Sequence, residues 1–387
     1  MRFPRWTRPL LLTSALALLC AGGKRKKAAE PANVEPPVEV QRPPAPTHGA
    51  LFPTGLPVDP GPTPRGLANR SAQGCNACHG ATHDAWRSSA HAAPMSPTFL
   101  EATAGTPECR VCHLPLSDQH ATLFTPGEPH AERPPNARFD ATLATEGVTC
   151  AACHLREGHV IGGTPPARAP HPGRFTTDLG TSEACATCHQ LTWPGADTPL
   201  YDTYGEWSRS PHAGADIGCV DCHMGPDAGH SAAPDHRFPA DPRRALSVLI
   251  ETDRLDIARG GDALDVTIRL QNTGAGHSVP TGSPFRGLRV VAALVCATDD
   301  GPHRHAELAV DLHRRLGEAA PWPTIEDTRL QAGGERHIPW TPSLGLDAPS
   351  GTWHLEVALH HTQVPLGAAP MQIDPPLSVS VLPLQVD

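Results

Sequence analysis

The sequence predicts a multidomain protein in which a mostly α-helical and loop-rich domain is followed by an all-β sandwich of the immunoglobulin-like type. Three observations lead to this fold class. Residues 71–243 contain five Cys-x-x-Cys-His motifs and little helical or strand periodicity. Residues 244–387 contain short runs of alternating apolar and polar residues, separated by turns with Gly and Pro. The chain holds 23 His but only 8 Phe and 2 Tyr. Large apolar side chains are therefore too few to form an extensive core by themselves.

Residues 1–20 are predicted to be an export signal. Three Arg within the first eight residues precede an apolar stretch from Leu10 to Leu19, which is shorter than the roughly 20 residues that span a bilayer. Cys20 follows directly, and this order resembles a bacterial lipoprotein signal with lipid attachment at Cys20. Leu19 stands where a small residue is usual, so an ordinary secretory signal cleaved nearby is the alternative. Both predict an exported protein of the periplasm or outer membrane.

Residues 21–70 are predicted to be a Pro-rich linker that cannot bury a core. Such a segment would hold the next domain away from the membrane that a lipid on Cys20 enters. The formal net charge is -9, and it becomes more negative once the three Arg of the signal are removed. This balance is not typical of nucleic-acid-binding proteins, so no nucleic-acid partner is expected.

Five motifs of the form Cys-x-x-Cys-His carry the chemistry of the first domain. In each motif, two thiols three positions apart can add to the two vinyl groups of one haem, and the His that follows can bind the iron. Zinc sites and disulfides also use paired Cys, but neither needs a His after every pair. The spacing predicts five covalently bound haems c in a pentahaem domain, residues 71–243, that wraps around them. The motifs are Cys75, Cys78 and His79; Cys109, Cys112 and His113; Cys150, Cys153 and His154; Cys185, Cys188 and His189; and Cys219, Cys222 and His223.

Haems that only transfer electrons usually have a second protein ligand on the iron. The pattern Trp-x-x-Ser-x-His-Ala occurs at 86–92, after the first motif, and at 207–213, after the fourth, which indicates an internal repeat. The repetition predicts that His91 and His212 are such distal ligands. Four other His of the domain are weaker candidates, and His120 is the best of them because it lies seven residues after a motif His. These four are His83, His120, His130 and His171.

From Gly74 to about Phe238 the chain resembles multihaem cytochromes of the c-552 and c-554 type, which are related to hydroxylamine-oxidising and nitrite-reducing multihaem proteins. The resemblance rests on the two repeat segments, on the Glu-Gly-Val-Thr sequence at 146–149 before the third motif, and on Met224 after the last one. In similar proteins a His shortly after the third motif is an axial ligand, so the resemblance implies that role for His159. It also makes His230 and His236 candidate distal ligands.

Five haems with two protein ligands each would pass electrons in series, which predicts an electron-transfer protein that works with redox partner proteins or a terminal electron acceptor. The alternative is an oxidoreductase acting on nitrite, hydroxylamine or a similar small oxyanion at one open haem. Related nitrite reductases have Lys in place of one proximal His, whereas all five motifs here end in His. Hydroxylamine oxidation in related enzymes uses a Tyr, and the chain has only Tyr201 and Tyr204. A third interpretation, a haem-based docking or sensing module, has no sequence feature in its favour.

The C-terminal region, residues 244–387, is predicted to form the β-sandwich. Alternating apolar and polar residues at 264–270, 289–295, 353–359 and 377–381 predict strands. Gly-rich and Asp-Gly turns at 260–261, 299–301 and 333–334 separate them. Cys296 lies in an apolar run and is predicted to be a buried core residue rather than a reactive thiol.

The segment 272–282 of this region, Asn-Thr-Gly-Ala-Gly-His-Ser-Val-Pro-Thr-Gly, resembles a loop of the β-domains that are appended to multihaem cytochromes. Gly residues before His277 would let the backbone approach a flat cofactor closely, and Pro280 would keep the loop rigid. One interpretation is that His277 reaches the first domain and binds a haem iron, which would lock the two domains together. The other is a structural turn with an exposed His277.

Overall fold

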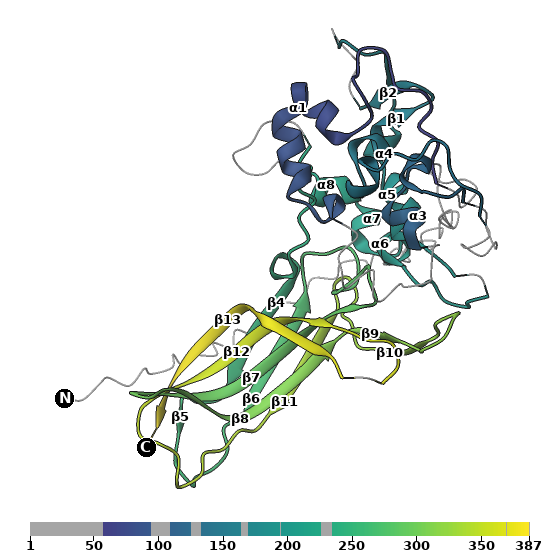
Figure 1. Ribbon diagram of the computed structural model, residues 1–387. Helices are drawn as coiled ribbons and strands as arrows, with labels where there is room; N and C mark the ends of the chain where they lie inside the picture. Colours follow the sequence, from purple (N-terminus) through teal and green to yellow (C-terminus); the bar gives the residue numbers. More distant parts are fainter. Residues whose placement is uncertain are drawn as a thin grey trace, which may run out of the picture. The chain divides into compact units, whose positions relative to one another are not determined.

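The computed structural model describes residues 57–93, 109–124, 133–163, 169–193, 195–225, 234–368 and 370–386, all of which belong to one compact unit, Pro44–Asp387. Short helices and loops occupy the chain up to about residue 244, and long strands follow (Figure 1). The coarse prediction of a helix- and loop-containing region followed by a β-rich region is confirmed.

The helices of the first region are short. The longest, α1 (Ala72–Arg87), begins after Ser71, whose Oγ accepts a hydrogen bond from the N–H of Gln73 at 3.1 Å. None of the helices within the described ranges is both long and apolar enough to cross a bilayer. The other helices within the described residues are α3 (Arg110–His113), α4 (Cys150–His154), α5 (Ser182–His189), α6 (Thr203–Ser208), α7 (Pro211–Gly214) and α8 (Cys219–His223), with single turns η1 (Ala90–Ala92), η3 (Ser117–Gln119), η5 (Leu143–Thr145), η6 (Asp178–Gly180) and η7 (Pro242–Arg244).

Few side chains form a core in the first region. A small sheet of β1 (Leu155–Arg156), β2 (His159–Gly162) and β3 (Gly173–Phe175) lies beside α4. One apolar cluster gathers small and medium-sized residues, which agrees with the shortage of large side chains in the sequence. Its buried members are Val58, Val111, Leu116, Ala151, Ala152 and Leu155.

The packed part of the first region begins before residue 71, the boundary expected from the sequence. Val58 forms a β-bridge with Leu116, and both are buried. Arg70 and Arg138 both pair with Asp118, whose side chain is fully buried. Residues 57–70, part of the predicted linker, are therefore held in the first region by backbone pairing and by buried charge.

The second region consists of two main sheets. One has the strand order β11-β6-β4 and the other β5-β13-β12-β7-β8, and a separate pair joins β9 and β10. Neighbouring strands of these sheets are antiparallel, except that β5 runs parallel to β13. The strands are β4 (Leu246–Thr252), β5 (Asp256–Ile257), β6 (Val266–Asn272), β7 (Arg286–Thr298), β8 (Gly301–Leu312), β9 (Arg314–Leu316), β10 (Thr324–Asp327), β11 (Glu335–Trp340), β12 (Thr352–Gln363) and β13 (Gln372–Val386).

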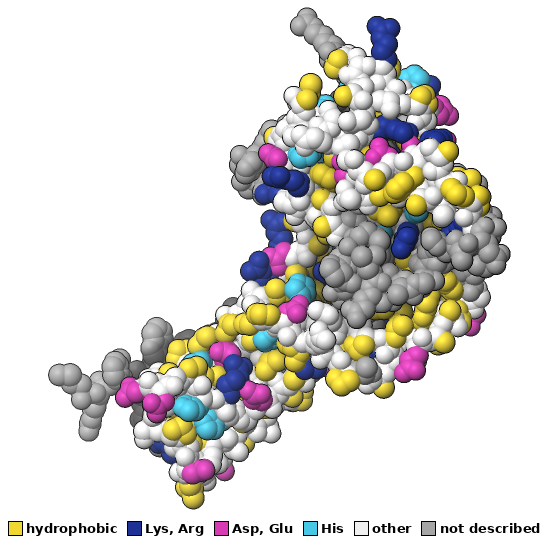
Figure 2. Space-filling view, in the orientation of Figure 1, with side chains coloured by type: hydrophobic (Ala, Val, Ile, Leu, Met, Phe, Trp, Pro, Cys, Tyr) yellow, Lys and Arg dark blue, Asp and Glu magenta, His cyan; other side chains and the backbone are white. Residues whose placement is uncertain are grey.

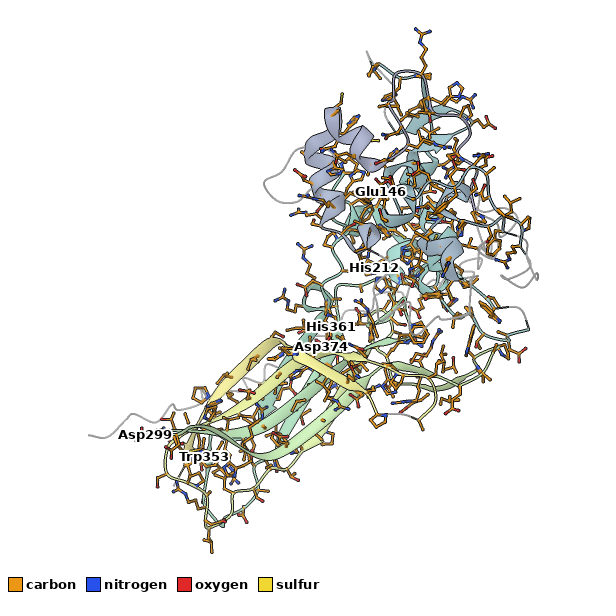
Figure 3. The ribbon with its side chains drawn as sticks, in the orientation of Figure 1. Glu146, His212, Asp299, Trp353, His361 and Asp374 are labelled. Atoms are coloured by element: carbon orange, nitrogen blue, oxygen red, sulfur yellow. The ribbon has the colours of Figure 1, made fainter. Side chains whose placement is uncertain are left out.

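One apolar core joins the two sheets. In β6 every second residue from Val266 to Asn272 is buried, as strand alternation requires. Trp353 of β12 is 1% exposed, and Cys296 of β7 is fully buried, as predicted for that thiol. Figure 3 shows Trp353 far along β12 from His361, at the opposite end of the strand. Burying a large apolar side chain contributes roughly 1.5–3 kcal/mol, so this core stabilises the β-region without any cofactor.

The strand β13 carries exposed apolar side chains. It pairs with β5 only at Gln385 and Val386, at its end. Ile373, Val379 and Val381 are about half exposed, and hydrophobic side chains are visible along this surface (Figure 2). The strand also contains three Pro, which lack an N–H and so weaken pairing with another chain at a sheet edge.

Candidate cofactor site

Each Cys-x-x-Cys-His motif lies at the end of a helical segment. The helices α3, α4, α5 and α8 end at a motif His, and in α1 the helical backbone is interrupted at His79, where φ is -112° and ψ is 41°. Residues three and four positions apart lie on one face of a helix. The two thiols and the imidazole of each motif therefore project to the same side and can hold one cofactor together.

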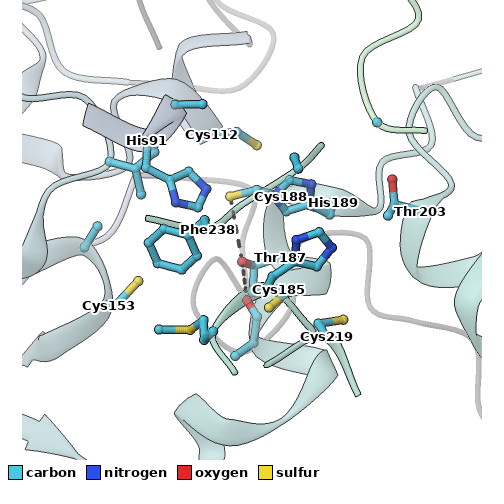
Figure 4. Close-up of a pocket in the computed structure, with 18 of the residues that line it drawn as sticks. His91, Cys112, Cys153, Cys185, Thr187, Cys188, His189, Thr203, Cys219 and Phe238 are labelled. Atoms are coloured by element: carbon cyan, nitrogen blue, oxygen red, sulfur yellow. Dashed lines mark hydrogen bonds between the residues drawn. The ribbon is translucent and has the colours of Figure 1, made fainter. Parts of the chain in front are cut away.

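The five motifs line a single cavity of about 3420 Å³, to which all ten motif Cys and all five motif His contribute. This volume is more than three times the roughly 1,000 Å³ at the upper end of the range for one small-molecule ligand. Figure 4 shows part of it, where the ring of His91 lies against Phe238 and near Cys188 and His189. The cavity has room for several large cofactors.

Neighbouring motifs are in contact through their thiols. The contacts join the first motif to the third, the fourth to the fifth, and the second to the fourth. An electrostatic interaction between Cys153 and Cys188 links the third motif to the fourth. The motifs thus form a continuous series, first to third to fourth, with the second and fifth both beside the fourth. The contacting pairs are Cys75 and Cys150, Cys185 and Cys219, and Cys112 and Cys188.

Three motif His are each paired with a non-motif His at nearly the same distance. A metal–imidazole bond is about 2.0 Å long and the bound nitrogen lies about 1.1 Å from the ring centroid, so two rings on opposite sides of one iron have centroids about 6.2 Å apart. All three pairs have this spacing. The centroids are 6.3 Å apart for His189 and His91, 6.2 Å for His154 and His236, and 6.1 Å for His223 and His277.

Backbone carbonyls orient four of these six imidazoles. Because a carbonyl oxygen only accepts, each Nδ1 that bonds to one carries the hydrogen, and Nε2 keeps a free lone pair. This is the arrangement usual for metal-binding His, whose second nitrogen donates to a carbonyl or carboxylate. The Nδ1 bonds run from His154 to Ile161 at 2.9 Å, from His223 to Pro239 at 2.7 Å, from His236 to Pro234 at 2.9 Å and from His277 to Ser278 at 2.9 Å.

Burial in the cavity favours the neutral form of four of the six paired imidazoles. Desolvation lowers the pKa of His189 to about 4, and it also lowers the pKa of His91, His154 and His277. The neutral imidazole is the form that binds a metal. Desolvation raises the pKa of the Cys153 thiol. Geometry and charge state together therefore fit the haem that the motifs predict.

The two copies of the repeat have the same hydrogen bonds. In the first copy, the indole N–H of Trp86 donates to the carbonyl of Val148, and the N–H of Val148 donates to the carbonyl of the repeat His, both at 2.9 Å. In the second copy, Trp207 donates to Ile217 at 2.8 Å, and Ile217 donates to the repeat His at 3.0 Å. Val148 and Ile217 each lie two residues before a motif. Each copy thus ties its repeat segment to the start of the third or the fifth motif.

The structure brings most of the predicted distal His to the cavity. His212 lines it, at the end of the first region nearest the strands (Figure 3). His171, a weaker candidate in the sequence, also lines it. His159 is not among the described residues that do so, because its Nδ1 bonds to the carbonyl of Glu157 at 3.0 Å within a surface turn. His230 and Cys20 lie outside the described residues, as does His130.

Two aromatic residues of the cavity contact groups that are far away along the chain. Tyr201 lies near the thiols of Cys109 and Cys112, and desolvation raises the pKa of its phenol. The ring of Phe238 lies 4.5 Å from that of His91. Their partners are about 90 to 150 positions away along the chain, and no spacing pattern signals such contacts.

No family model matches the chain, and no curated protein matches it. Among solved structures it is similar to a penta-haem cytochrome c552 from Thermochromatium tepidum, with a TM-score of 0.59 and 19% identity over 83% of this chain and 100% of that chain. The CARDB domain of a Pyrococcus furiosus protein matches 37% of this chain and 87% of its own length, with a TM-score of 0.20 and 12% identity. An immunoglobulin-like protein from Pseudomonas aeruginosa matches 37% and 96%, with a TM-score of 0.18 and 13% identity. Only the first likeness is close enough to carry an argument, and it shows a shared fold.

Proposed function

We propose that the protein is a multihaem c-type cytochrome that transfers electrons through five covalently bound haems in the cell envelope. The observation that carries the proposal is the set of three His pairs with centroids 6.1 to 6.3 Å apart. Each pair joins a motif His to a His from another part of the chain and leaves the space of one iron between the rings. The fold shared with a penta-haem cytochrome supports it.

The ten motif Cys would form the thioether bonds, and the five motif His would be the proximal ligands. His91, His236 and His277 would be the distal ligands at the fourth, third and fifth motifs. Haem supplies one-electron chemistry at its iron when bound. Two His on one iron would close it to substrates, which favours electron transfer over catalysis.

The contacts between motifs support transfer along a series of haems. Thiol contacts bring the first motif to the third and the fourth to the fifth, and Cys153 lies near Cys188 between them. Haems attached at neighbouring motifs would lie close together, because each thioether fixes the edge of its haem to the Cys. Electrons could then enter at one end of this series and leave at the other, between redox partner proteins or toward a terminal acceptor.

Haem counting tests the cofactor part of the proposal. The mass of the intact mature protein should exceed the polypeptide mass by five haems, and a pyridine haemochrome assay should give the same number. A count of four or fewer with all ten motif Cys intact would show that at least one motif does not bind haem.

The alternative, reduction of nitrite or oxidation of hydroxylamine, requires an iron without a distal protein ligand. Tyr201 lies near the thiols of the second motif. The second motif is therefore where this alternative would place the open iron. Adding nitrite, hydroxylamine or cyanide to the oxidised protein distinguishes the two functions. An unchanged haem spectrum supports the electron carrier, whereas a spectral shift in one haem supports the enzyme.

We also propose that Cys20 is lipidated and anchors the protein to a membrane. The short apolar stretch that ends at Cys20 and the Pro-rich segment after it support this. Cys20→Ser should release the protein into the soluble periplasmic fraction with its haem content unchanged. A wild-type protein already found in that fraction, or a mature N-terminus elsewhere, would contradict the anchor.

The β-region would form an immunoglobulin-like sandwich. The sheet orders β4-β6-β11 and β8-β7-β12-β13 support this, because consecutive strands are distributed between the sheets as strands A, B, E and C, F, G are in that fold. Its role in the proposed function is to supply the loop that carries His277.

A further inference from the structure

The residue that precedes the repeat Trp differs between the two copies. Glu206 precedes Trp207 in the second copy, whereas Ala85 precedes Trp86 in the first. The side chain of Glu206 is only 9% exposed. A carboxylate buried to this degree needs donors, because desolvating a charge without partners is strongly unfavourable.

Three donors from the β-region satisfy Glu206. Oε2 accepts from the backbone N–H of Ser278 at 3.1 Å and from Oγ1 of Thr281 at 2.6 Å. Oε1 accepts from Nη1 of Arg329 at 2.7 Å. The Arg329 side chain is only 12% exposed and is also held by Asp327, with Nη2 at 2.7 Å. One side chain of the first region thus gathers two points of the loop 272–282 and an Arg beside it.

These bonds act on the residue next to His277. The carbonyl of Ser278 accepts from Nδ1 of His277, while the N–H of the same residue donates to Glu206. From the other side, Nδ2 of Asn272 donates to the carbonyl of His277 at 2.8 Å. The peptide group between His277 and Ser278 is therefore held at both ends, its carbonyl from within the β-region and its N–H from the first region.

The loop also approaches the second repeat so closely that a side chain at Gly276 would be crowded. A Cβ atom on Gly276 would lie 3.0 Å from Cβ of His212 and 3.2 Å from Cδ1 of Trp207. The glycine permits this approach, but a glycine-rich loop is flexible and needs an anchor. Glu206, one residue before Trp207, supplies the anchor on the same helix, α6.

We propose that Glu206 is a positioning residue that holds the 272–282 loop so that the imidazole of His277 stays opposite His223. The proposal rests on the proposed function, in which these two His are the axial ligands of the haem at the fifth motif. It makes docking of the β-region and closure of that iron one coupled event, because the bonds that fasten the loop to the first region also orient its His. The other four irons do not depend on Glu206.

The test compares Glu206→Ala and Glu206→Gln with wild type in the holoprotein. In Glu206→Ala, one of the five haems should become partly high-spin in EPR and bind added cyanide, and its midpoint potential alone should shift. Glu206→Gln keeps the volume and one acceptor oxygen but loses the charge that faces Arg329, so a smaller effect on the same haem is expected. The matched control is Glu183→Gln, whose carboxylate accepts from the hydroxyl of Tyr204 at 2.9 Å, within the first region and not from the loop. Because Glu183 also acts electrostatically on Cys219 of the fifth motif, the control is judged by spin state and cyanide binding, and it should leave all haems low-spin and closed to cyanide.

His277→Ala separates this inference from the assignment on which it depends. If His277→Ala opens one haem and Glu206→Ala leaves every haem as in wild type, Glu206 does not position the loop, although the ligand assignment stands. If His277→Ala itself changes no haem, the assignment fails. In the double variant, Glu206→Ala should add nothing to the effect of His277→Ala, because both act on one ligand. Should Glu206→Ala fail to accumulate with five haems, the spectrum of Glu206→Gln decides, and a spectrum identical to wild type overturns the proposal.

Discussion

At the scale of single residues, a free Nε2 is not sufficient to make a His a proposed ligand. His236 bonds through Nδ1 to a carbonyl two residues earlier, and His159 does the same. In both side chains Nδ1 therefore carries the hydrogen, and Nε2 keeps the lone pair that could bind a metal. The two side chains differ in position, because His236 lies 6.2 Å from His154 whereas His159 points to the surface turn at Glu157. Position in the fold, rather than local chemistry, separates a proposed ligand from a surface His.

His236→Ala and His159→Ala form a matched pair that tests this distinction. His236→Ala should open the iron at the third motif, seen as one haem of five becoming high-spin and binding cyanide. His159→Ala should leave all haems low-spin, because no iron loses a ligand. The measurement is EPR of the oxidised proteins with and without cyanide. The opposite pattern would return the distal role to His159, as the resemblance implied.

The sequence indicated the candidate ligands better than it indicated their partners. His91 follows the first motif along the chain, yet it pairs with His189 of the fourth. His277 is more than fifty positions from His223. Such pairs form through the fold, and a single sequence contains no periodicity that links them. The resemblance implied a ligand role for His159, but its ring bonds to the carbonyl of Glu157 and it is not among the described residues that line the cavity.

At the scale of elements, the repeat is a unit that joins two motifs. Its Trp bonds to a carbonyl two residues before the third or the fifth motif. In the first copy, Cys75 of the first motif contacts Cys150 of the third motif, to which that repeat segment is bonded. In the second copy, Cys185 of the fourth motif contacts Cys219 of the fifth in the same way. In the first copy, the second motif lies between the repeat segment and the third motif, whereas no motif lies between the repeat segment and the fifth motif in the second copy. The extra length of the first copy therefore contains one whole motif.

Trp86→Phe and Trp207→Phe should weaken the two copies alike. Each change keeps most of the aromatic packing but removes one indole N–H and leaves a carbonyl without its donor, which costs about 1 kcal/mol. The free energy of unfolding in guanidinium chloride measures the loss for each holoprotein. Trp340→Phe, in β11, is the control for the loss of ring size alone. If only one of the two repeat variants lost stability beyond the control, the copies would not be equivalent units.

The strands show where alternation is a sufficient signal. β6 and β12 were predicted because one of their faces is apolar at every second residue, and that face lies in the core. β8 was not predicted, since most of its residues are exposed or half-buried and its sequence, with three charged residues and two His, has little alternation. It forms because β7 offers it backbone partners along most of its length, with one register shift between Ala292 and Leu294. Edge strands of this kind are specified by their neighbours more than by their own residues.

At the scale of the whole molecule, two kinds of interior meet. The β-region has a continuous apolar core, whereas the first region has one small apolar cluster beside a cavity of about 3420 Å³. The β-region can therefore be stable by side-chain packing, while the first region would depend on its cofactors to fill its centre. The loop 272–282 joins the two, since it belongs to the β-region and lines the cavity.

The central claim is that the motif irons are closed by protein ligands and act as electron carriers. EPR of the fully oxidised holoprotein, with spins counted against a haem assay on the same sample, tests it most directly. The account predicts low-spin ferric signals that add up to five haems and do not change when nitrite or cyanide is added. A high-spin signal from one haem that shifts on adding nitrite would contradict it and would identify an open iron at which chemistry takes place.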